Sequence, residues 1–571
     1  MEESLQQFFR LLKNQSLPRE VFMEVDYISK QLEANPLLLT GDVQIILKHL
    51  ESNAESFFTP EAQKCTIRAA GLRQEGNRLY ERKQFLKSLE KYNESICMAP
   101  NNSANLGIGY ANRSAVYYEM KMYGLAIANI ELALKHHYPQ HLKPNLYDRE
   151  FNCRLKHDKT DFSWNRSEYV RLIGIFDVVP KPSLTHLAKG IVNQELPTGD
   201  RAMVAEKDFA AGECILQESP LIGSVGWDKR FTRCNFCFSA NLLNLIPCSS
   251  CTSVMFCNEL CMKAGQRQHR FECGSSTNMS RFYEKWIGPR LFFHGLSLFE
   301  CDFGKMMTFC RENRGSGTLF STLDYSKYDP KEEFRMFLRT RVEHPSYERL
   351  GSTIQNFFAV LFFKMYLNVP LVRSLVANKA QENFMLQCFL DFMHITQRLF
   401  VSRSHEGFLY PVASDFGQSC DPNAIVLGSG RYMQMIVLRP IRRGEQIVIS
   451  YDGKLCYQRR VDFNCRLLTL KLTCSCIVCN ESAGQQLWWE KYKQPCSIDR
   501  DCLLAMQRIA SNEDLPRVER INAMQQFVQK HGSNHPQKDF AKVVERYRDE
   551  LVDSFRFLSM VTDYCYATAD Y

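Results

Sequence analysis

The chain has 571 residues, of which 45% are hydrophobic and 23% charged, and its formal net charge is +8. This is the composition of an ordinary globular protein, and the length suits about three or four domains. No run of five or six like charges occurs, which argues against direct nucleic-acid binding through a basic arm and against an acidic tail. The longest apolar run, near Phe357 to Val372, is interrupted by Lys364 and Pro370, so no membrane span is expected. The acidic residues of Met1-Glu2-Glu3-Ser4 lead us to expect an amphipathic stretch there and not a signal peptide.

In residues 1–160 the apolar residues have the spacing expected of α-helices. Residues 1–60 are expected to form short amphipathic helices. Residues 61–160 then contain a repeat whose first copy is marked by Leu72, Gly76, Leu79, Ser88, Tyr92, Ser95 and Pro100. Its second copy, offset by 38 residues, is marked by Ser114, Tyr117, Ala126, Ile130, Ala133 and Tyr138. This spacing is typical of tetratricopeptide (TPR) helix pairs, which form peptide-binding scaffolds; the alternative is a plain helical bundle. A poorer third unit begins near Leu146.

Short β segments follow from about residue 185. Residues 208–215 are echoed by residues 439–447, and each copy is expected to form a strand, a glycine-containing turn and a second strand. Between the two copies, residues 274–400 have mainly helical spacing, and residues 483–571 return to amphipathic helix. A cysteine-rich segment lies immediately before the helical stretch.

Twelve residues have the types and spacing of zinc ligands. The first group consists of Cys234, Cys237, Cys248, Cys251, Cys257, Cys261, His269 and Cys273. The second consists of Cys474, Cys476 and Cys479, with Cys420 as the expected fourth ligand. Zinc takes four tetrahedral sulfur or imidazole ligands, so about three closed structural ions are predicted. A disulfide framework is the alternative, but a long chain without a secretory leader favours reduced thiols and a cytoplasmic and nuclear location.

Three motifs together carry a family resemblance: Cys420-Asp-Pro-Asn423, Arg443-Gly-Glu-Gln-Ile-Val-Ile-Ser-Tyr451, and the cysteine triplet of residues 474–479. They resemble a SET methyltransferase core with its post-SET zinc loop, and the first cysteine group resembles a MYND zinc finger. A SET domain split by a MYND finger is similar to the SMYD family, closest to its TPR-bearing type. The expected fold is a multidomain α+β protein. Its segments are N-terminal helices (1–60), TPR-like repeats (61–160), the first part of the SET domain (185–233), the MYND finger (234–273), a helical insertion (274–400), the second part of the SET domain (401–455), the post-SET loop (456–482) and C-terminal helices (483–571).

The resemblance also implies how the zinc ligands are shared. In MYND fingers the ligands interleave, so one zinc ion would be bound by the first and third cysteine pairs and the other by the second and fourth pairs. The first set would be Cys234, Cys237, Cys257 and Cys261, and the second Cys248, Cys251, His269 and Cys273. With four protein ligands each, both ions would be structural.

The activity implied by the resemblance is methyl transfer from S-adenosylmethionine to a lysine of a histone or non-histone protein. This in-line displacement needs a neutral amine aligned with the methyl–sulfur axis. In SET enzymes a tyrosine hydroxyl helps to hold that amine, and Tyr451 occupies the matching position. The alternative for Tyr451 is an ordinary tyrosine in a core strand.

The cofactor pocket departs from the family pattern. Its expected residues are Arg201, Ala202, Gly417, Gln418, Tyr451 and Leu472. Gly417 and Gln418 stand where an asparagine and a histidine usually bind the cofactor, and Leu470 and Leu472 replace a tyrosine and a phenylalanine. Each lost polar contact costs about 1–3 kcal/mol if its partner stays buried and unpaired. Two functions therefore remain open: a methyltransferase with an atypical pocket, or a catalytically inactive adaptor that keeps the SET fold.

A protein partner is suggested by four polar residues of the repeats. Some TPR modules bind the acidic C-terminal tail of cytosolic heat-shock chaperones through basic and asparagine side chains. Arg73, Asn77, Asn112 and Arg149 fall at the matching positions. The alternative is that the asparagines are helix-start residues and the arginines are solvated. Proteins of this family are usually monomeric, so a monomer is expected.

Overall fold

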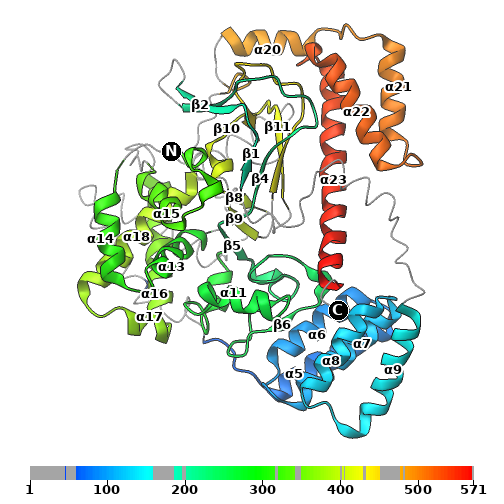
Figure 1. Ribbon diagram of the computed structural model, residues 1–571, viewed down its shortest axis with the longest axis vertical. Helices are drawn as coiled ribbons and strands as arrows, with labels where there is room; N and C mark the ends of the chain where they lie inside the picture. The colour runs from blue at the N-terminus through cyan, green and yellow to red at the C-terminus, as the bar shows by residue number, and fades with distance from the viewer. Residues whose placement is uncertain are drawn as a thin grey trace.

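The fold combines helical layers with several small sheets (Figure 1). The computed structural model describes Ile46, Leu50 and residues 60–157, 185–195, 201–283, 285–315, 319–340, 349–398, 401–403, 406–428, 433–450, 476–479 and 483–568. The helices expected in residues 1–60 thus lie almost wholly outside the described residues. No helix within these ranges is both long enough and apolar enough to span a bilayer.

Two antiparallel helix pairs and a further helix follow residue 65. They are α5 (Thr66–Glu81), α6 (Phe85–Met98), α7 (Ala104–Glu119), α8 (Tyr123–Lys135), η1 (Gln140–Leu142) and α9 (Lys143–His157). Small residues allow close packing: a β-carbon on Gly76 would lie 2.4 Å from Cε1 of Tyr92. The turns inside the two pairs are equivalent, because Lys83 and Lys121 have positive φ angles of 57° and 59°. These residues are 38 positions apart, which is the offset of the sequence repeat.

A cysteine-rich unit, residues 227–273, contains little regular structure. Its elements are η2 (Trp227–Lys229), η3 (Asn241–Leu243), β6 (Ile246–Pro247), β7 (Met255–Phe256) and α11 (Glu259–His269). The strands form a short antiparallel hairpin. Asn258 caps α11, because its side chain accepts a hydrogen bond from the backbone N–H of Cys261 at 2.8 Å.

The β region is assembled from two stretches of chain that flank the cysteine-rich unit and the helical insertion. Its strands are β1 (His186–Leu187), β2 (Ile191–Glu195), β3 (Arg201–Ala205), β4 (Cys214–Glu218), β5 (Ile222–Val225), β8 (Val401–Arg403), β9 (Glu406–Leu409), β10 (Gly417–Gln418), β11 (Ala424–Gly428), β12 (Met433–Val437) and β13 (Val448–Ile449). The largest sheet has the order β1-β4-β12-β11, and β5 pairs with β9. The two echoed segments are joined by a bridge between Phe209 and Ile441. Their turns use Gly212 and Gly444 at φ angles of 88° and 86°, where a side chain would be strained.

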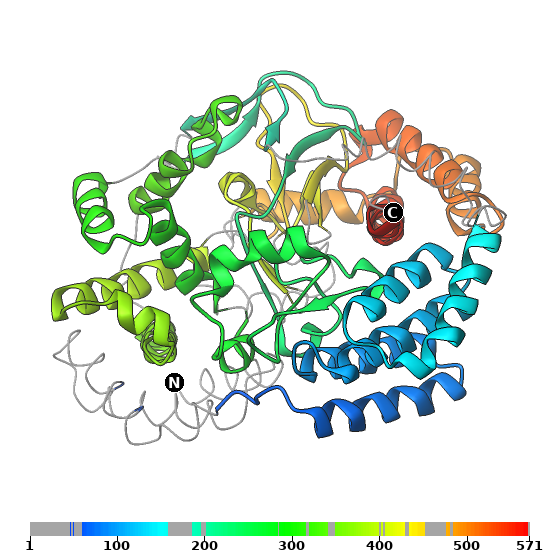
Figure 2. The ribbon, with the colours of Figure 1, turned by 60° about the horizontal axis from the view of Figure 1, so that its bottom comes forward.

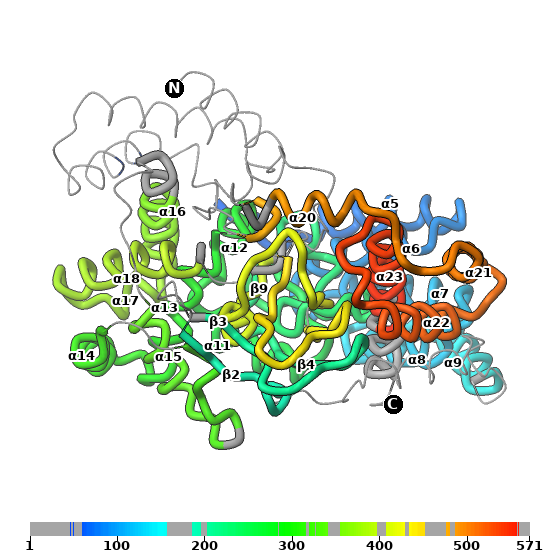
Figure 3. Tube along the Cα trace, turned by 90° about the horizontal axis from the view of Figure 1, so that it is seen from above, coloured from blue at the N-terminus to red at the C-terminus, as the bar shows by residue number. Residues whose placement is uncertain are grey.

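Helices cover the β region on both sides (Figure 3). One group is α12 (Ser276–Ser280), α13 (Ile287–Leu298), α14 (Phe303–Asn313), η4 (Phe320–Thr322), η5 (Tyr325–Lys327), α15 (Pro330–Arg339), α16 (Arg349–Leu367), α17 (Pro370–Leu375) and α18 (Lys379–Arg398). The other is α20 (Ala483–Lys493), α21 (Arg500–Ser511), α22 (Arg517–His531), η7 (Gly532–Asn534) and α23 (Lys538–Thr568). The apolar run of the sequence lies in α16, where Phe357 and Phe358 are fully buried in the main core.

The helix pairs and the cysteine-rich unit share one core (Figure 2). At its centre lies the fully buried Arg113 of α7. The guanidinium donates to Oδ1 of Asn93 (2.6 Å), Oδ1 of Asn129 (2.7 Å), the carbonyl of Leu245 (2.6 Å) and Oδ1 of Asn244 (3.1 Å). Since two of these acceptors belong to the cysteine-rich unit, one side chain satisfies polar groups on both sides of the contact. No local sequence pattern indicated this arrangement.

Candidate zinc centres and cofactor pocket

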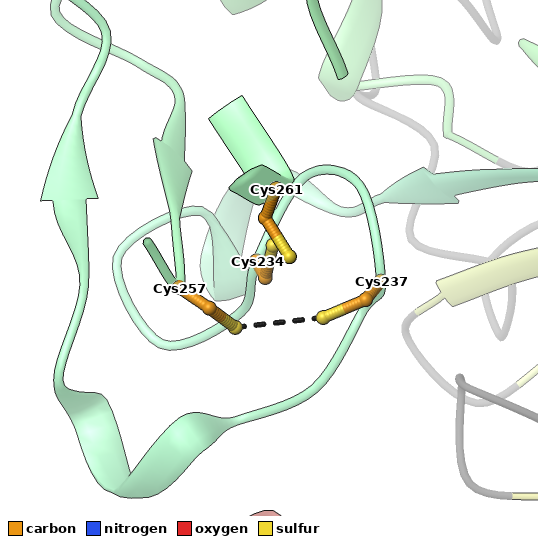
Figure 4. Close-up of side chains that lie close together, drawn as sticks. All are labelled: Cys234, Cys237, Cys257 and Cys261. Atoms are coloured by element: carbon orange, nitrogen blue, oxygen red, sulfur yellow. Dashed lines mark hydrogen bonds between the residues drawn. The ribbon is translucent and has the colours of Figure 1, made fainter. Parts of the chain in front are cut away.

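Four cysteines from three parts of the cysteine-rich unit point toward one another (Figure 4). They are Cys234, Cys237, Cys257 and Cys261, and their sulfur atoms all lie within 4.8 Å of one another. The sulfurs of Cys237 and Cys257 are 3.4 Å apart, far longer than the S–S bond of a disulfide, which is about 2.0 Å. Tetrahedral Zn–S bonds of about 2.3 Å place ligand sulfurs roughly 3.8 Å apart, so this cluster suits a zinc ion.

A second cluster forms beside the first from the remaining ligands of the unit. It consists of Cys248, Cys251, His269 and Cys273. Nε2 of His269, at the end of α11, lies 3.3 Å from the sulfur of Cys248 and 3.5 Å from that of Cys251. The structure therefore groups the eight ligands in the interleaved sets that the family resemblance implies. Every described cysteine is free of disulfide bonding.

A third cluster joins distant parts of the chain. Cys420 follows β10 and lies beside Cys476 and Cys479, with 3.3 Å between the sulfurs of Cys420 and Cys479. These are three of the four ligands expected there, and Cys474 lies outside the described residues.

The residue after Cys420 connects this cluster to the C-terminal helices. Trp488 Nε1 of α20 donates to Oδ2 of Asp421 at 3.0 Å, and His535 Nε2 lies 2.8 Å from the same oxygen. Burial alone would raise the pKa of Asp421, but the charges of His535 and Arg439 and the hydrogen bonds of His535 and Trp488 together outweigh it and hold the pKa at about 2. Because α20 carries no recognisable motif, this contact could not be found from the sequence.

Four of the six predicted cofactor residues lie on β3 and β10, the two strands that flank residues 446–449, and we call these three segments the seam. The segment that contains β13 runs between β3 and β10: Val204 of β3 bridges Gln446, while Gly417 and Gln418 pair in parallel with Val448 and Ile449. The structure thus brings the strand of Arg201 and Ala202 and the strand of Gly417 and Gln418 to opposite sides of residues 446–449. Tyr451 and Leu472 lie outside the described residues.

Hydrogen bonds fix the backbone of this seam. The side chain of Asn423 donates to the carbonyl of Gln446 at 2.8 Å and accepts from the N–H of Val448 at 2.9 Å. The turn before Gly417 is held by Glu218, whose two carboxyl oxygens accept from the N–H groups of Val412 and Ala413. Burial raises the pKa of Glu218 to about 8, although these two hydrogen bonds oppose the shift.

The four residues predicted to bind a peptide are all half-buried in the helix pairs. Asn112 donates to Oδ1 of Asn77 at 2.8 Å, so the structure brings these two together. Arg149 of α9 donates to the carbonyl of Ala111 at 3.0 Å. Nε of Arg73 is buried and makes no hydrogen bond within the described residues. The alternative that the asparagines start helices is wrong, because α5 begins at Thr66 and α7 at Ala104.

The comparisons with known proteins agree with the geometry of the cysteine-rich unit. The family model for the MYND finger matches residues 234–273, which contain the first two clusters. The chain is 26% identical over 221 residues to a zebrafish (Danio rerio) protein named Protein-lysine N-methyltransferase SMYD4. That match covers 36% of this chain and 29% of the relative.

Further relatives extend the similarity. The human (Homo sapiens) SMYD4 protein is 24% identical over 35% of this chain and 33% of its own length. A chicken (Gallus gallus) protein named N-lysine methyltransferase SMYD2 is 24% identical over 57% of this chain and 66% of its own length. The chain is therefore similar in sequence to proteins of the SMYD family. The matches to the two SMYD4 proteins span only about a third of their lengths, and the MYND finger at residues 234–273 is the part of this chain that a family model matches.

Proposed function

We propose that the chain is an S-adenosylmethionine-dependent protein-lysine methyltransferase whose SET core is formed by the strands on either side of the finger. The observation that carries the proposal is the seam at residues 446–449. The parallel pairing of β10 with β13 sets Gly417 and Gln418 beside Val448 and Ile449, two residues before Tyr451 in the sequence. The names of the SMYD4 and SMYD2 relatives support the same reaction class.

The residues of the seam fit a polar cofactor. Gly417, Gln418 and Gln446 are all half-buried there, and the two glutamines offer amide groups that can both donate and accept hydrogen bonds. In the proposed mechanism Arg201, Ala202, Gly417 and Gln418 would bind S-adenosylmethionine, which supplies the methyl group when bound. The Tyr451 hydroxyl would orient a neutral lysine amine of a histone or another protein along the line of transfer.

Replacing Tyr451 by phenylalanine tests this function. Tyr451→Phe should abolish transfer of a radiolabelled methyl group to lysine peptide arrays, because the amine loses the hydroxyl that orients it. Zinc content and melting temperature should stay unchanged. Tyr147→Phe, which alters an exposed tyrosine of α9, is the matched control and should keep full activity. If the wild-type protein neither binds S-adenosylmethionine nor methylates any peptide, the enzyme proposal fails and the inactive adaptor remains.

The helix pairs favour a second candidate function, which is compatible with the first: binding of an acidic peptide tail such as that of a cytosolic heat-shock chaperone. The paired amides of Asn77 and Asn112 and the buried, unbonded Nε of Arg73 support it. Arginine can bind a carboxylate through two parallel hydrogen bonds, and asparagine can bind a peptide amide.

A peptide that ends in Glu-Glu-Val-Asp should bind the full chain in the micromolar range at low salt. Arg73→Ala should weaken that binding about tenfold, roughly 1.4 kcal/mol, in fluorescence-anisotropy titrations. Arg78→Ala is the control, because Arg78 is exposed on the same helix. Absence of binding by the wild type, or equal binding by wild type and Arg73→Ala, would exclude this partner.

A further inference from the structure

The side-chain amide of Gln446 lies beside Gly417 in the seam. A β-carbon placed on Gly417 would lie only 2.9 Å from Nε2 of Gln446 and 3.7 Å from Cγ1 of Val448. The first distance is shorter than ordinary van der Waals contact. The amide of Gln446 therefore occupies the space in which a side chain at position 417 would begin.

The backbone of Gln446 is held firmly in this place. Its carbonyl accepts from Nδ2 of Asn423 at 2.8 Å, and the next residue, Ile447, donates to the carbonyl of Met203 at 2.8 Å. Gln446 also bridges Val204, so its strand is fixed between β3 and β10. The side-chain amide itself is half-buried and makes no hydrogen bond to any described residue. It is therefore available to a ligand in the seam.

We propose that Gln446 supplies a side-chain amide that binds a polar group of S-adenosylmethionine, in place of a side chain at residue 417. This inference rests on the proposed methyltransferase function and deepens it. Gly417 of β10 has no side chain with which to bind the cofactor. The amide of Gln446, which lies just before β13, occupies the space beside it. A side chain at residue 417 would therefore have to share this space with the end of the Gln446 side chain, which would need to shift.

Isothermal titration of S-adenosylmethionine and S-adenosylhomocysteine into the full chain tests the proposal, with four proteins compared. Gln446→Ala should weaken binding about tenfold. Gly417→Asn alone should bind no better than wild type, because the new side chain competes with Gln446 for space. The double variant Gly417→Asn/Gln446→Ala should bind about as well as wild type. Gln74→Ala, at an exposed position of α5, is the control and should bind like wild type.

The outcomes separate the inference from the function. If the wild-type chain does not bind either cofactor form, both the methyltransferase proposal and the role of Gln446 are overturned. If the wild type binds and Gln446→Ala binds equally well, only the role of Gln446 is overturned. Should Gln446→Ala also melt at a lower temperature, the double variant decides: recovered affinity supports the role of Gln446, and unrecovered affinity refutes it.

Discussion

Replacing Cys251 by serine is expected to remove one zinc ion from the finger and to loosen the helix pairs packed against it. Cys251 is a ligand of the second cluster and lies in the same core as Ala69, Ile96 and Leu146. Zinc binding in small fingers contributes about 10–16 kcal/mol to folding, so its loss should exceed the effect of any single side-chain contact. Thr252, the residue after Cys251, donates a hydrogen bond from Oγ1 to the carbonyl of Ala62 at 2.7 Å. Loss of the zinc ion should therefore also loosen the segment before α5.

Zinc content by plasma mass spectrometry and hydrogen exchange of the α5–α7 amides measure this effect. Zinc should fall by about one ion per chain, and the helix amides should exchange faster. Cys502→Ser is the control, because Cys502 is an exposed free thiol of α21 and should change neither quantity. Loss of zinc with unchanged protection of α5–α7 would mean that the helix pairs fold independently of the finger.

Arg113→Met should have the next largest effect. Methionine fills a similar length but leaves three buried acceptors unpaired, on Asn93, Asn129 and Leu245, whereas Oδ1 of Asn244 keeps its hydrogen bond from Nδ2 of Asn129 at 2.9 Å. Each unsatisfied acceptor costs about 1–3 kcal/mol, so a loss of about 4 kcal/mol is expected. In hydrogen exchange this corresponds to a fall of roughly 1000-fold in the protection of the α7 amides.

A control for Arg113→Met is available on the surface of the same helical unit. Arg154 of α9 is largely exposed and pairs with Glu150 at 2.6 Å. Exposed ion pairs contribute little, so Arg154→Met should change the opening free energy by less than about 0.5 kcal/mol. Equal effects of the two substitutions would show that the buried network does not hold the helix pairs to the finger.

Features with a local signature could be predicted from the sequence. The mixture of helices and strands and the zinc-type cysteine clusters follow from spacing within short windows, where two-residue and helical periods are visible. The helix turns at Lys83 and Lys121 repeat at the same offset as the sequence pattern. The sequence pattern also predicted that Gly417 and Gln418 belong to one cofactor pocket, but it assigned no role to Gln446, which lies in the motif of residues 443–451.

The residues that sequence reasoning missed act over long separations. Arg113 contacts Leu245, 132 positions away, and Trp488 contacts Asp421, 67 positions away. A buried arginine looks like any other arginine in a helical pattern. Trp488 belongs to no motif, and the motif of residues 420–423 that contains Asp421 does not indicate its partner. Only the packing of separate segments determines which of these polar groups become partners. The closeness of Gly417 to the amide of Gln446 is of the same kind, because it depends on how β10 and β13 pair.

The split β region has a consequence for how the chain is made. β4 pairs with β12, yet Glu218 and Met433 at their paired ends are separated by 215 positions, 433 minus 218. Ribosomes add about 5–20 residues per second, so β4 must wait roughly 10 to 40 s for its neighbour to emerge. During that interval the finger, which needs only local chain and zinc, and the helices α13–α18 can form first. The central sheet therefore closes only after these parts, and until then the unpaired edge of β4 is open to aggregation.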